Sequence, residues 1–357
     1  MIVLLILLSA VLLAFLLRKS DKIVQLIPFI ILFLFSVFRY QYGNDYLSYN
    51  QAYLKINSGY ESFFSKEILF TTLNKISPNF RFFLILTSLI FVGVLTYFLM
   101  KNLDDDKRWM GILILVINPY LFLINLSAIR QGLAIAVFVI AAYFLWKRKI
   151  IWYALCIIIA SLFHKSAIIL LPIYFIVNDK KNSVLPMVMI IMLIVSLLWS
   201  GFDELLIKIT SLFDDTNYNY YVSQGMSNSI RATLLSSLYL IYTFMNLKKL
   251  EGKELAFGKL YLIGCIFSVL AFRLSMFTRI QMYFDIFSIV ALPAIFSKVQ
   301  AEGNVVLDAS RPVATLWNIV NKYAMPILLA LVYFLRFYSF MSNPLWSSFT
   351  TYNLPFM

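Results

Sequence analysis

Charged residues are scarce in this chain. They make up 13% of its 357 residues, whereas 62% are hydrophobic and 17% are aromatic. A soluble domain needs about 25% charged residues to cover its surface. The composition therefore excludes an ordinary soluble domain and indicates a polytopic membrane protein. The net charge of +13 must then be sorted by membrane side, and nucleic acid is not an expected partner.

Cysteine and histidine are almost absent. The two cysteines, Cys156 and Cys265, lie inside apolar runs, so no disulfide framework is indicated. The one histidine, His164, has no paired carboxylates at ligand spacing to help it hold a metal. A glycine-rich phosphate loop is also missing from the sequence. These absences leave metal hydrolases and ATP-driven proteins without support, and no metal and no cofactor is expected.

Long apolar runs dominate what is present. A membrane-spanning helix needs about 20 apolar residues, and fewer where neighbouring protein shields its ends. This rule predicts an all-α integral membrane protein with a single transmembrane domain over 1–357. About twelve spans are expected, near 2–17, 23–38, 82–100, 109–126, 132–146, 150–163, 166–177, 184–200, 232–247, 259–275, 282–297 and 324–341. Pro119 is expected to kink the fourth.

The distribution of Lys and Arg predicts the orientation. With the N-terminus outside, 18 of the 30 basic residues fall in inner loops, most of them short, where this bias is most informative. Both termini then face out. Two larger outer segments, 39–81 and 201–231, are expected to carry short amphipathic helices at the interface.

Four polar sequences meet on that outer side. They contain Asp45 with Tyr46 and Tyr49, then Arg130 with Gln131, then His164 with Lys165, and finally Arg273 with Arg279. Arg39 and Arg336 add two more cations near outer span ends. For Arg273 and Arg279 to point into one cavity, the helix would have to break near Ser275, because six residues of continuous helix turn them about 120° apart.

Each of these groups has two readings. Arginine presents a planar fork suited to bidentate phosphate contacts, so the outer arginines fit a lipid-linked diphosphate, but contact with lipid headgroups would also explain them. His164 is either a base or a helix-end residue bonded to the backbone. The tyrosines around Asp45 could pack against sugar rings, but a belt of tyrosines at the membrane interface would give the same composition.

Four stretches of the sequence, in this order, resemble one family. They are "YGNDYLSY" (42–49), "AIRQGLAIAVFVIAAYFLWKRK" (128–149), "LFHKSAIILLPIYF" (162–175) and "RIQMYFDIFSIVALP" (279–293). Together they are similar to the EpsG-like branch of the Wzy oligosaccharide repeat-unit polymerases, over residues 36 to 297. The branch serves O-antigen, capsule or exopolysaccharide synthesis.

The resemblance implies a fold, a reaction and partners. The fold is that of GT-C glycosyltransferases. Donor and acceptor are undecaprenyl-diphosphate-linked oligosaccharides at the periplasmic face of the bacterial inner membrane, with no metal and no nucleotide sugar. A flippase and a chain-length regulator are further expected partners. The expected base is His164 or Asp45, with Arg130 as a third catalytic residue. The expected substrate-binding residues are Arg279, Arg273, Gln131, Tyr46, Tyr49, Lys165, Arg336 and Arg39.

Rival functions remain open at this point. A ligase of the O-antigen type would share the fold and the Arg/His chemistry. A lipid-linked oligosaccharide flippase or other transporter would more often show repeated halves and charges near the bilayer midplane, whereas the polar residues here collect at one face. A scaffold for an export complex would need none of these arginines.

Overall fold

The computed structural model describes residues 2–60, 67–178, 230–271, 277–301, 316 and 318–354. Within those ranges every element is a helix, and the sole β-type pairing is an isolated bridge between Tyr40 and Asn353. The all-α prediction is therefore confirmed. The chain forms two compact units, and each is described by itself below. Unit 1 is Met1–Ala141, Ile151–Ile168 and Tyr333–Met357, and unit 2 is Ala142–Ile150 and Ile169–Val332.

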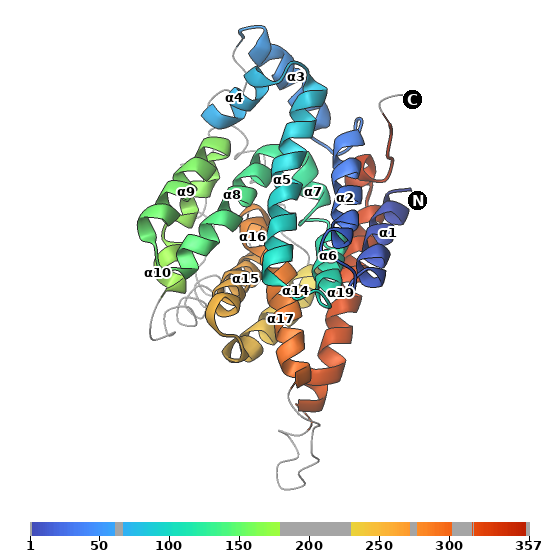
Figure 1. The fold of residues 1–357 in the computed structure, drawn as a ribbon, viewed down its shortest axis with the longest axis vertical. Coiled ribbons are helices and arrows are strands. Elements are labelled where there is room, and N and C mark those ends of the chain that lie inside the picture. Colours follow the sequence, from blue (N-terminus) through green and yellow to red (C-terminus); the bar gives the residue numbers. More distant parts are fainter. Residues whose placement is uncertain are drawn as a thin grey trace. The chain divides into compact units, whose positions relative to one another are not determined.

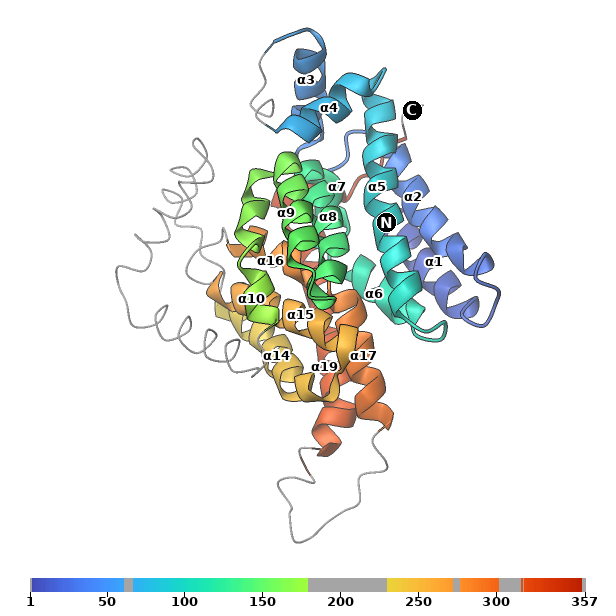
Figure 2. The same cartoon turned by 60° about the vertical axis from the view of Figure 1, so that its left-hand side comes forward.

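Unit 1 begins with a group of apolar helices (Figures 1 and 2). It contains α1 (Ile2–Leu16), η1 (Val24–Leu26), α2 (Ile27–Phe38), α5 (Phe80–Asn102), α6 (Arg108–Ile117) and α7 (Leu123–Ser127). Helix α2 packs against α1 and α5, and α1 also packs against α6. Pro28 lies in the first turn of α2, where its missing N–H costs nothing, and the Asn79 side chain caps α5 by accepting from the N–H of Phe82 at 2.8 Å.

Two further helices of unit 1 carry the polar residues of interest. Most of α8 (Ile129–Trp146) belongs to this unit, as does α9 (Ile150–Phe163), which ends at His164 and is followed by η2 (Lys165–Leu170). Gly132 lets α8 approach α7 closely, because a Cβ at this position would lie 2.9 Å from the carbonyl oxygen of Asn125. This close approach fixes the first turn of α8 against α7.

The segment between α2 and α5 contains two short helices, α3 (Tyr46–Asn57) and α4 (Ile68–Ile76). They pack against each other, and the Tyr53 hydroxyl donates to the carbonyl of Ser77 at 2.6 Å. The buried ring of Phe70 on α4 contacts the rings of Tyr49 and Phe83. These contacts join α3, α4 and the start of α5. Of the other predicted outer segment, 201–231, all but the last two residues lie outside the described part of the chain.

Unit 2 is built around α15 (Gly252–Leu270). This helix packs against α10 (Ile173–Val177), α14 (Ile230–Asn246), α16 (Phe277–Asp285) and α17 (Ser288–Ala301), and is buried along most of its length. A Cβ at Gly264 would lie 2.8 Å from Oδ1 of Asp285, so this glycine permits the contact with α16. The side-chain amides of Asn246 and Asn321 bond reciprocally at 2.9 and 2.8 Å, which satisfies both inside the core.

The remaining helices of the described residues are short, apart from α19. Helices η3 (Leu247–Lys249) and η4 (Val320–Ala324) lie in unit 2, and η5 (Pro344–Phe349) lies in unit 1. Helix α19 (Met325–Ser342) begins in unit 2 and ends in unit 1.

Three helices in the described ranges are long and apolar enough to cross a membrane: Phe80–Asn102, Ile129–Trp146 and Val320–Ser342. A fourth span is possible if α16 and α17, which are bent by 57° at their junction, count as one. Five shorter apolar helices accompany them, at Ile2–Leu16, Val24–Phe38, Arg108–Ile117, Ile150–Phe163 and Lys165–Val177. The chain is therefore a helical membrane protein. Twelve spans and a GT-C fold stay predictions, and the predicted span 184–200 lies outside the described residues.

Candidate functional site

A buried carboxylate, that of Glu67, organises the polar residues of unit 1. Glu67 directly precedes α4 and is only 5% exposed. In the sequence it is one of seven acidic residues in or near the predicted outer segments, and nothing there distinguishes it from the other six. An ionised carboxylate is almost never buried unless it is paired. Its surroundings therefore identify the partners that it needs.

Those partners come from three separate parts of the chain. Oε2 of Glu67 lies 2.8 Å from Nη1 of Arg130, and Oε1 lies 3.2 Å from Nδ1 of His164. Oε1 also accepts a hydrogen bond from the backbone N–H of Lys165 at 3.3 Å. One carboxylate thus binds a guanidinium, an imidazole and a backbone amide. The Arg130 and His164 side chains are 17% and 15% exposed, so the cluster is mostly buried but reachable.

Local structure holds these partners in place. Arg130 is the second residue of α8, directly after the short α7. His164 continues α9, since its N–H bonds to the carbonyl of Ala160 at 3.0 Å, and its own carbonyl accepts from Ala167 at 3.0 Å. The two side chains therefore project from helix ends.

Tyr49 of α3 completes the cluster. Its hydroxyl accepts from the backbone N–H of Arg130 at 3.5 Å and also interacts with the guanidinium of Arg130. Burial raises the pKa of Tyr49 despite the opposing effect of the Arg130 charge, so the hydroxyl stays protonated at neutral pH. Tyr49 therefore contributes a neutral polar group.

The charge state of Glu67 follows from the same contacts. Burial by itself raises its pKa, but the His164 hydrogen bond and the Arg130 charge outweigh burial, and the pKa lies below its ordinary value of 4.5. Glu67 is therefore ionised at neutral pH. With His164 neutral, the Glu67 and Arg130 charges cancel.

Asp45 lies close to this cluster but is held differently. It precedes α3, its side chain is exposed, and its backbone N–H donates to Oγ of Ser127 at 3.0 Å. Gly43 makes this approach possible because it has φ +89°, and a Cβ there would lie 2.8 Å from Cβ of Ser127. The charge of Asp45 acts on Tyr49, so the two residues are near neighbours.

The other predicted site residues are distributed over both units. Gln131 is buried beside Arg130 on α8, and the side chain of Lys165 is exposed to solvent. Tyr46 is largely buried and packs on Phe80 and Tyr40. Arg39 is buried at the end of α2. The half-buried Arg336 lies on α19 within unit 1, and the exposed Arg279 lies on α16 in unit 2. Arg273 falls outside the described residues, as does the expected break near Ser275.

The contacts of the cluster allow acid–base chemistry. A neutral imidazole whose Nδ1–H donates to a carboxylate carries its lone pair on Nε2, and the carboxylate stabilises the imidazolium that forms when Nε2 takes a proton. Within the described ranges, no group of three or more His, Cys, Asp or Glu residues is arranged to hold a metal ion. The cluster is therefore a candidate for general-base catalysis by a side chain.

The model of the EpsG family matches residues 22–354, nearly the whole chain. Curated proteins and solved structures give no match.

Proposed function

The chain belongs to the EpsG family, a branch of the Wzy-like polymerases, and from this premise we propose that it joins lipid-linked oligosaccharide repeat units into a polysaccharide. The proposed donor is a glycan on undecaprenyl diphosphate, and the proposed acceptor is a sugar hydroxyl of a second lipid-linked unit. The observation that carries the proposal is the buried Glu67 carboxylate, which binds both His164 and Arg130. It supplies a base and an oriented cation in one place.

The proposed reaction is a glycosyl transfer. Nε2 of His164 accepts the proton of the acceptor hydroxyl while that oxygen forms a bond to the anomeric carbon of the donor sugar. The bond between the anomeric carbon and the diphosphate oxygen breaks, and the lipid diphosphate leaves with the electron pair. Because a diphosphate is a stable anion, the protein has to stabilise charge on the leaving group more than it has to protonate it. Glu67 keeps the imidazole in the tautomer that can accept the proton.

Asp45 is the alternative base. Its exposed carboxylate lies near Tyr49, at the edge of the same cluster. We retain both candidates, since the reaction needs one base only. In the arrangement we propose, Tyr46, Tyr49 and Gln131 orient sugars, and Lys165 adds positive charge at the solvent-facing side.

The arginines are proposed to bind the lipid diphosphate. Arg130 shares its charge with Glu67, and its guanidinium is a planar group with five N–H donors, a geometry that suits phosphate oxygens. Arg279, Arg273, Arg336 and Arg39 are proposed as further contacts to the diphosphates of donor and acceptor. No metal and no cofactor enters this scheme.

We further propose a location and partners. The chain would lie in the bacterial inner membrane as a multi-pass protein, with both termini and the His164 cluster on the periplasmic side. A flippase that delivers the lipid-linked units and a chain-length regulator would be its partners. Cysteines introduced at Asn57 and His164 should then react with an impermeant maleimide in intact cells, whereas a cysteine at Asn182 should not. The reverse labelling pattern would refute this orientation.

A deletion strain tests the function itself. If the chain is a polymerase, deletion should leave surface glycan with single repeat units and no long chains, and the wild-type gene should restore long chains. Complete loss of surface glycan would refute the proposal in favour of a flippase or a ligase. The His164→Ala variant, expressed at wild-type level, should give the same single-repeat profile as the deletion.

A further inference from the structure

Two arginines meet where α2 and α5 come together in unit 1. Arg39 directly follows α2, and Arg81 is the second residue of α5. Nη1 of Arg81 donates to the backbone carbonyl of Arg39 at 3.2 Å, and the Arg81 guanidinium lies 5.6 Å from the centre of the Phe38 ring. Burial is the main cause of the lowered pKa of Arg39, and the charge of Arg81 lowers it further, so the two cations are close enough to repel. Two cations this close together need a nearby negative charge to offset their repulsion.

No carboxylate of the described residues provides that compensation. Neither Arg39 nor Arg81 has an acidic side chain within ion-pairing distance in that part of the chain. The other largely buried arginines of unit 1 do have one: Arg108 lies 2.6 Å from Asp105, and Arg130 lies 2.8 Å from Glu67. Yet Arg39 is the most deeply buried of these residues, at 2% exposed. Buried charges are normally paired, so we expect an anion to bind beside Arg39 and Arg81.

The groups around the two arginines are hydrogen-bond donors without negative charge. Tyr42, Tyr46 and Tyr352 all interact electrostatically with Arg39. Burial raises the pKa of each, that of Tyr352 to about 12, so all three remain neutral. The Tyr352 hydroxyl donates to the carbonyl of Phe35 at 2.8 Å. Burial lowers the pKa of Arg39 only to about 10, so Arg39 stays a cation at neutral pH.

Two of these donors are buried and lack an acceptor. The Tyr42 hydroxyl, on a residue 1% exposed, and Nη2 of Arg81 have no hydrogen-bond partner. Arg39 itself uses Nη1, which donates to the Ser36 carbonyl and to Oγ of Ser88 at 3.0 Å. The Tyr42 hydroxyl and Nη2 of Arg81 are therefore two buried donors for which the described residues supply no acceptor.

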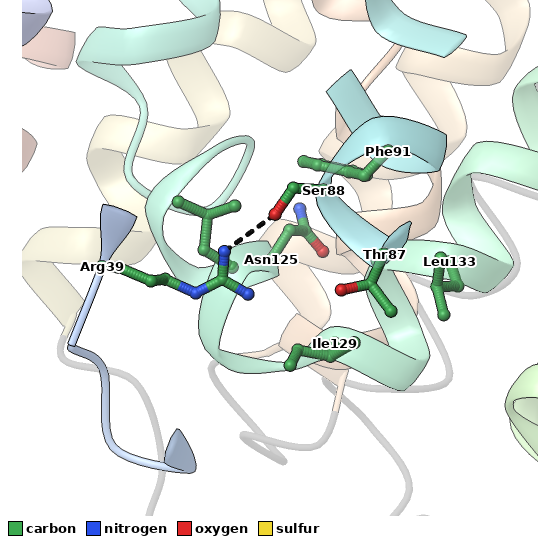
Figure 3. A pocket seen from close by; sticks show the side chains of 9 residues that line it. Arg39, Thr87, Ser88, Phe91, Asn125, Ile129 and Leu133 are labelled. Atoms are coloured by element: carbon green, nitrogen blue, oxygen red, sulfur yellow. Dashed lines mark hydrogen bonds between the residues drawn. The ribbon is translucent and has the colours of Figure 1, made fainter. Parts of the chain in front are cut away.

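The acceptor cannot enter from the interior. On its inner side Arg39 borders a cavity lined by Thr87, Ser88, Asn125 and Ile129 (Figure 3), with a volume of about 10 Å³. That volume holds roughly one water molecule, too little for a phosphate. Arg81 is only partly buried, and the neighbouring Tyr40 is 40% exposed. Arg81 is therefore the more exposed of the two arginines.

We propose that Arg39 and Arg81, with the Tyr42 hydroxyl, form a binding site for a phosphate group carried by a lipid. Two guanidiniums match the charge of a phosphate or diphosphate, and their planar forks match its oxygens. The site is distinct from the Glu67 cluster, where the charges of Glu67 and Arg130 cancel. The anion site rests on the contacts above, and the choice of a lipid as its carrier rests on the proposed function.

The test is a binding measurement on the purified full-length chain in a detergent without phosphate. Native mass spectrometry would titrate three probes separately: an undecaprenyl diphosphate, a phosphatidylglycerol, and inorganic diphosphate. We expect at least one of the lipids to bind, and Arg81→Gln to weaken that binding tenfold or more. Arg81→Lys should recover only part of the loss, because it keeps the charge but not the fork. Binding of the polyprenyl lipid alone would identify a substrate lipid, and equal binding of both lipids would identify a headgroup site.

Two controls keep this outcome specific. Lys101→Gln removes a positive charge from the other end of α5 and should leave affinity unchanged. Arg81 is the position to vary because it is partly exposed, whereas substitution of Arg39 risks the fold. Equal affinity of wild type and Arg81→Gln, or no lipid binding by the wild type, would overturn the proposal. Because the assay measures no polymerisation, its failure is distinguishable from a failure of the deletion-strain test.

Discussion

Oε1 of Glu67 lies 3.2 Å from Nδ1 of His164, a residue 97 positions later in the chain, while the other carboxylate oxygen holds Arg130 at 2.8 Å. This single carboxylate links the beginning of α4, the beginning of α8 and the end of α9. It is almost fully buried, and its pKa is held low by the residues that it binds. Glu67 is therefore a positioning residue in the reaction that we propose, because it acts through His164 and Arg130.

The first prediction concerns this positioning role. Glu67→Gln keeps the shape of the side chain but removes its charge, so it no longer stabilises the imidazolium of His164. We expect polymerisation by the purified enzyme to slow by about 10²-fold, on the scale of a general-base contribution, with a smaller change in KM for the lipid-linked substrate. Asp104→Asn is the matched control, since it removes an exposed carboxylate that pairs with Lys107. Equal kcat for Glu67→Gln and wild type would show that Glu67 is only structural.

A second prediction separates the two candidate bases. His164→Gln can still accept a hydrogen bond from a sugar hydroxyl but cannot take its proton, so chain extension should stop. Asp45→Asn should leave much of the activity, because the Asp45 side chain is exposed and Glu67 contacts His164 directly. Glycan chain length in a complemented deletion strain, at matched protein level, measures both. An inactive Asp45→Asn beside an active His164→Gln would move the base to Asp45.

The long spans were predictable because hydropathy is a local property. The predicted spans 82–100, 132–146 and 324–341 correspond to α5, α8 and α19. Pro119 was expected to kink the fourth span. Instead α6 ends at Ile117 and helix resumes only at Leu123, because a proline also disfavours helix for the residue before it. The 57° bend between α16 and α17 falls inside the predicted span 282–297, where apolar composition gives no sign of it.

The site was harder to predict because its contacts are far apart in sequence. His164 and Arg130 stand out as polar groups between apolar runs, and Tyr49 lies in a polar stretch that the sequence also singles out. The structure brings all three together. Glu67 does not stand out, since an acidic residue in a predicted outer segment is normally expected to be solvated. The one available signal was the need of Arg130 for a counterion, and seven acids could have met that need. Arg81 does not stand out either, because an arginine at a span end is normally explained by contact with lipid headgroups.

The third prediction tests how Gly43 sets the loop that carries Asp45. Gly43→Ala must adopt a positive φ and place its Cβ 2.8 Å from Cβ of Ser127, so we expect a loss of about 1–3 kcal/mol of stability and a lower Tm in detergent. Gly59→Ala is the matched control, because Gly59 also has a positive φ, +80°, but nothing lies within 4 Å of a Cβ there. A similar Tm for both variants would mean that the Ser127 contact contributes nothing.

The fourth prediction follows from the low pKa of Glu67. A carboxyl whose pKa is lower in the folded than in the unfolded chain stabilises the fold above its unfolded value, 4.5, and loses that contribution as pH falls through the folded value. The Tm of the wild type should therefore fall more steeply than that of Glu67→Gln as pH is lowered from 6 to 3. Other carboxyls titrate in both proteins, so the difference between the two curves isolates Glu67. Parallel curves would contradict the low pKa.

The last prediction concerns the ion pair between Arg130 and Glu67. Arg130→Met leaves the Glu67 carboxylate buried without its cation, and removing one partner of a buried pair typically costs about 3–5 kcal/mol. Arg130→Lys retains the charge and should cost much less stability, but it loses the guanidinium fork and should slow polymerisation by roughly tenfold. Arg279→Lys, on the exposed face of α16, should leave Tm unchanged while testing the second proposed diphosphate contact.

A double-mutant cycle with Glu67→Gln then measures the pair directly. If the two residues interact as the 2.8 Å contact indicates, Glu67→Gln with Arg130→Met should be less destabilised than the sum of the single variants, by at least about 1 kcal/mol. Chemical unfolding in detergent gives the four free energies. Additive effects would show that the contact contributes no coupling, and Glu67 would then have to be stabilised in its charged form by His164 and the Lys165 amide alone.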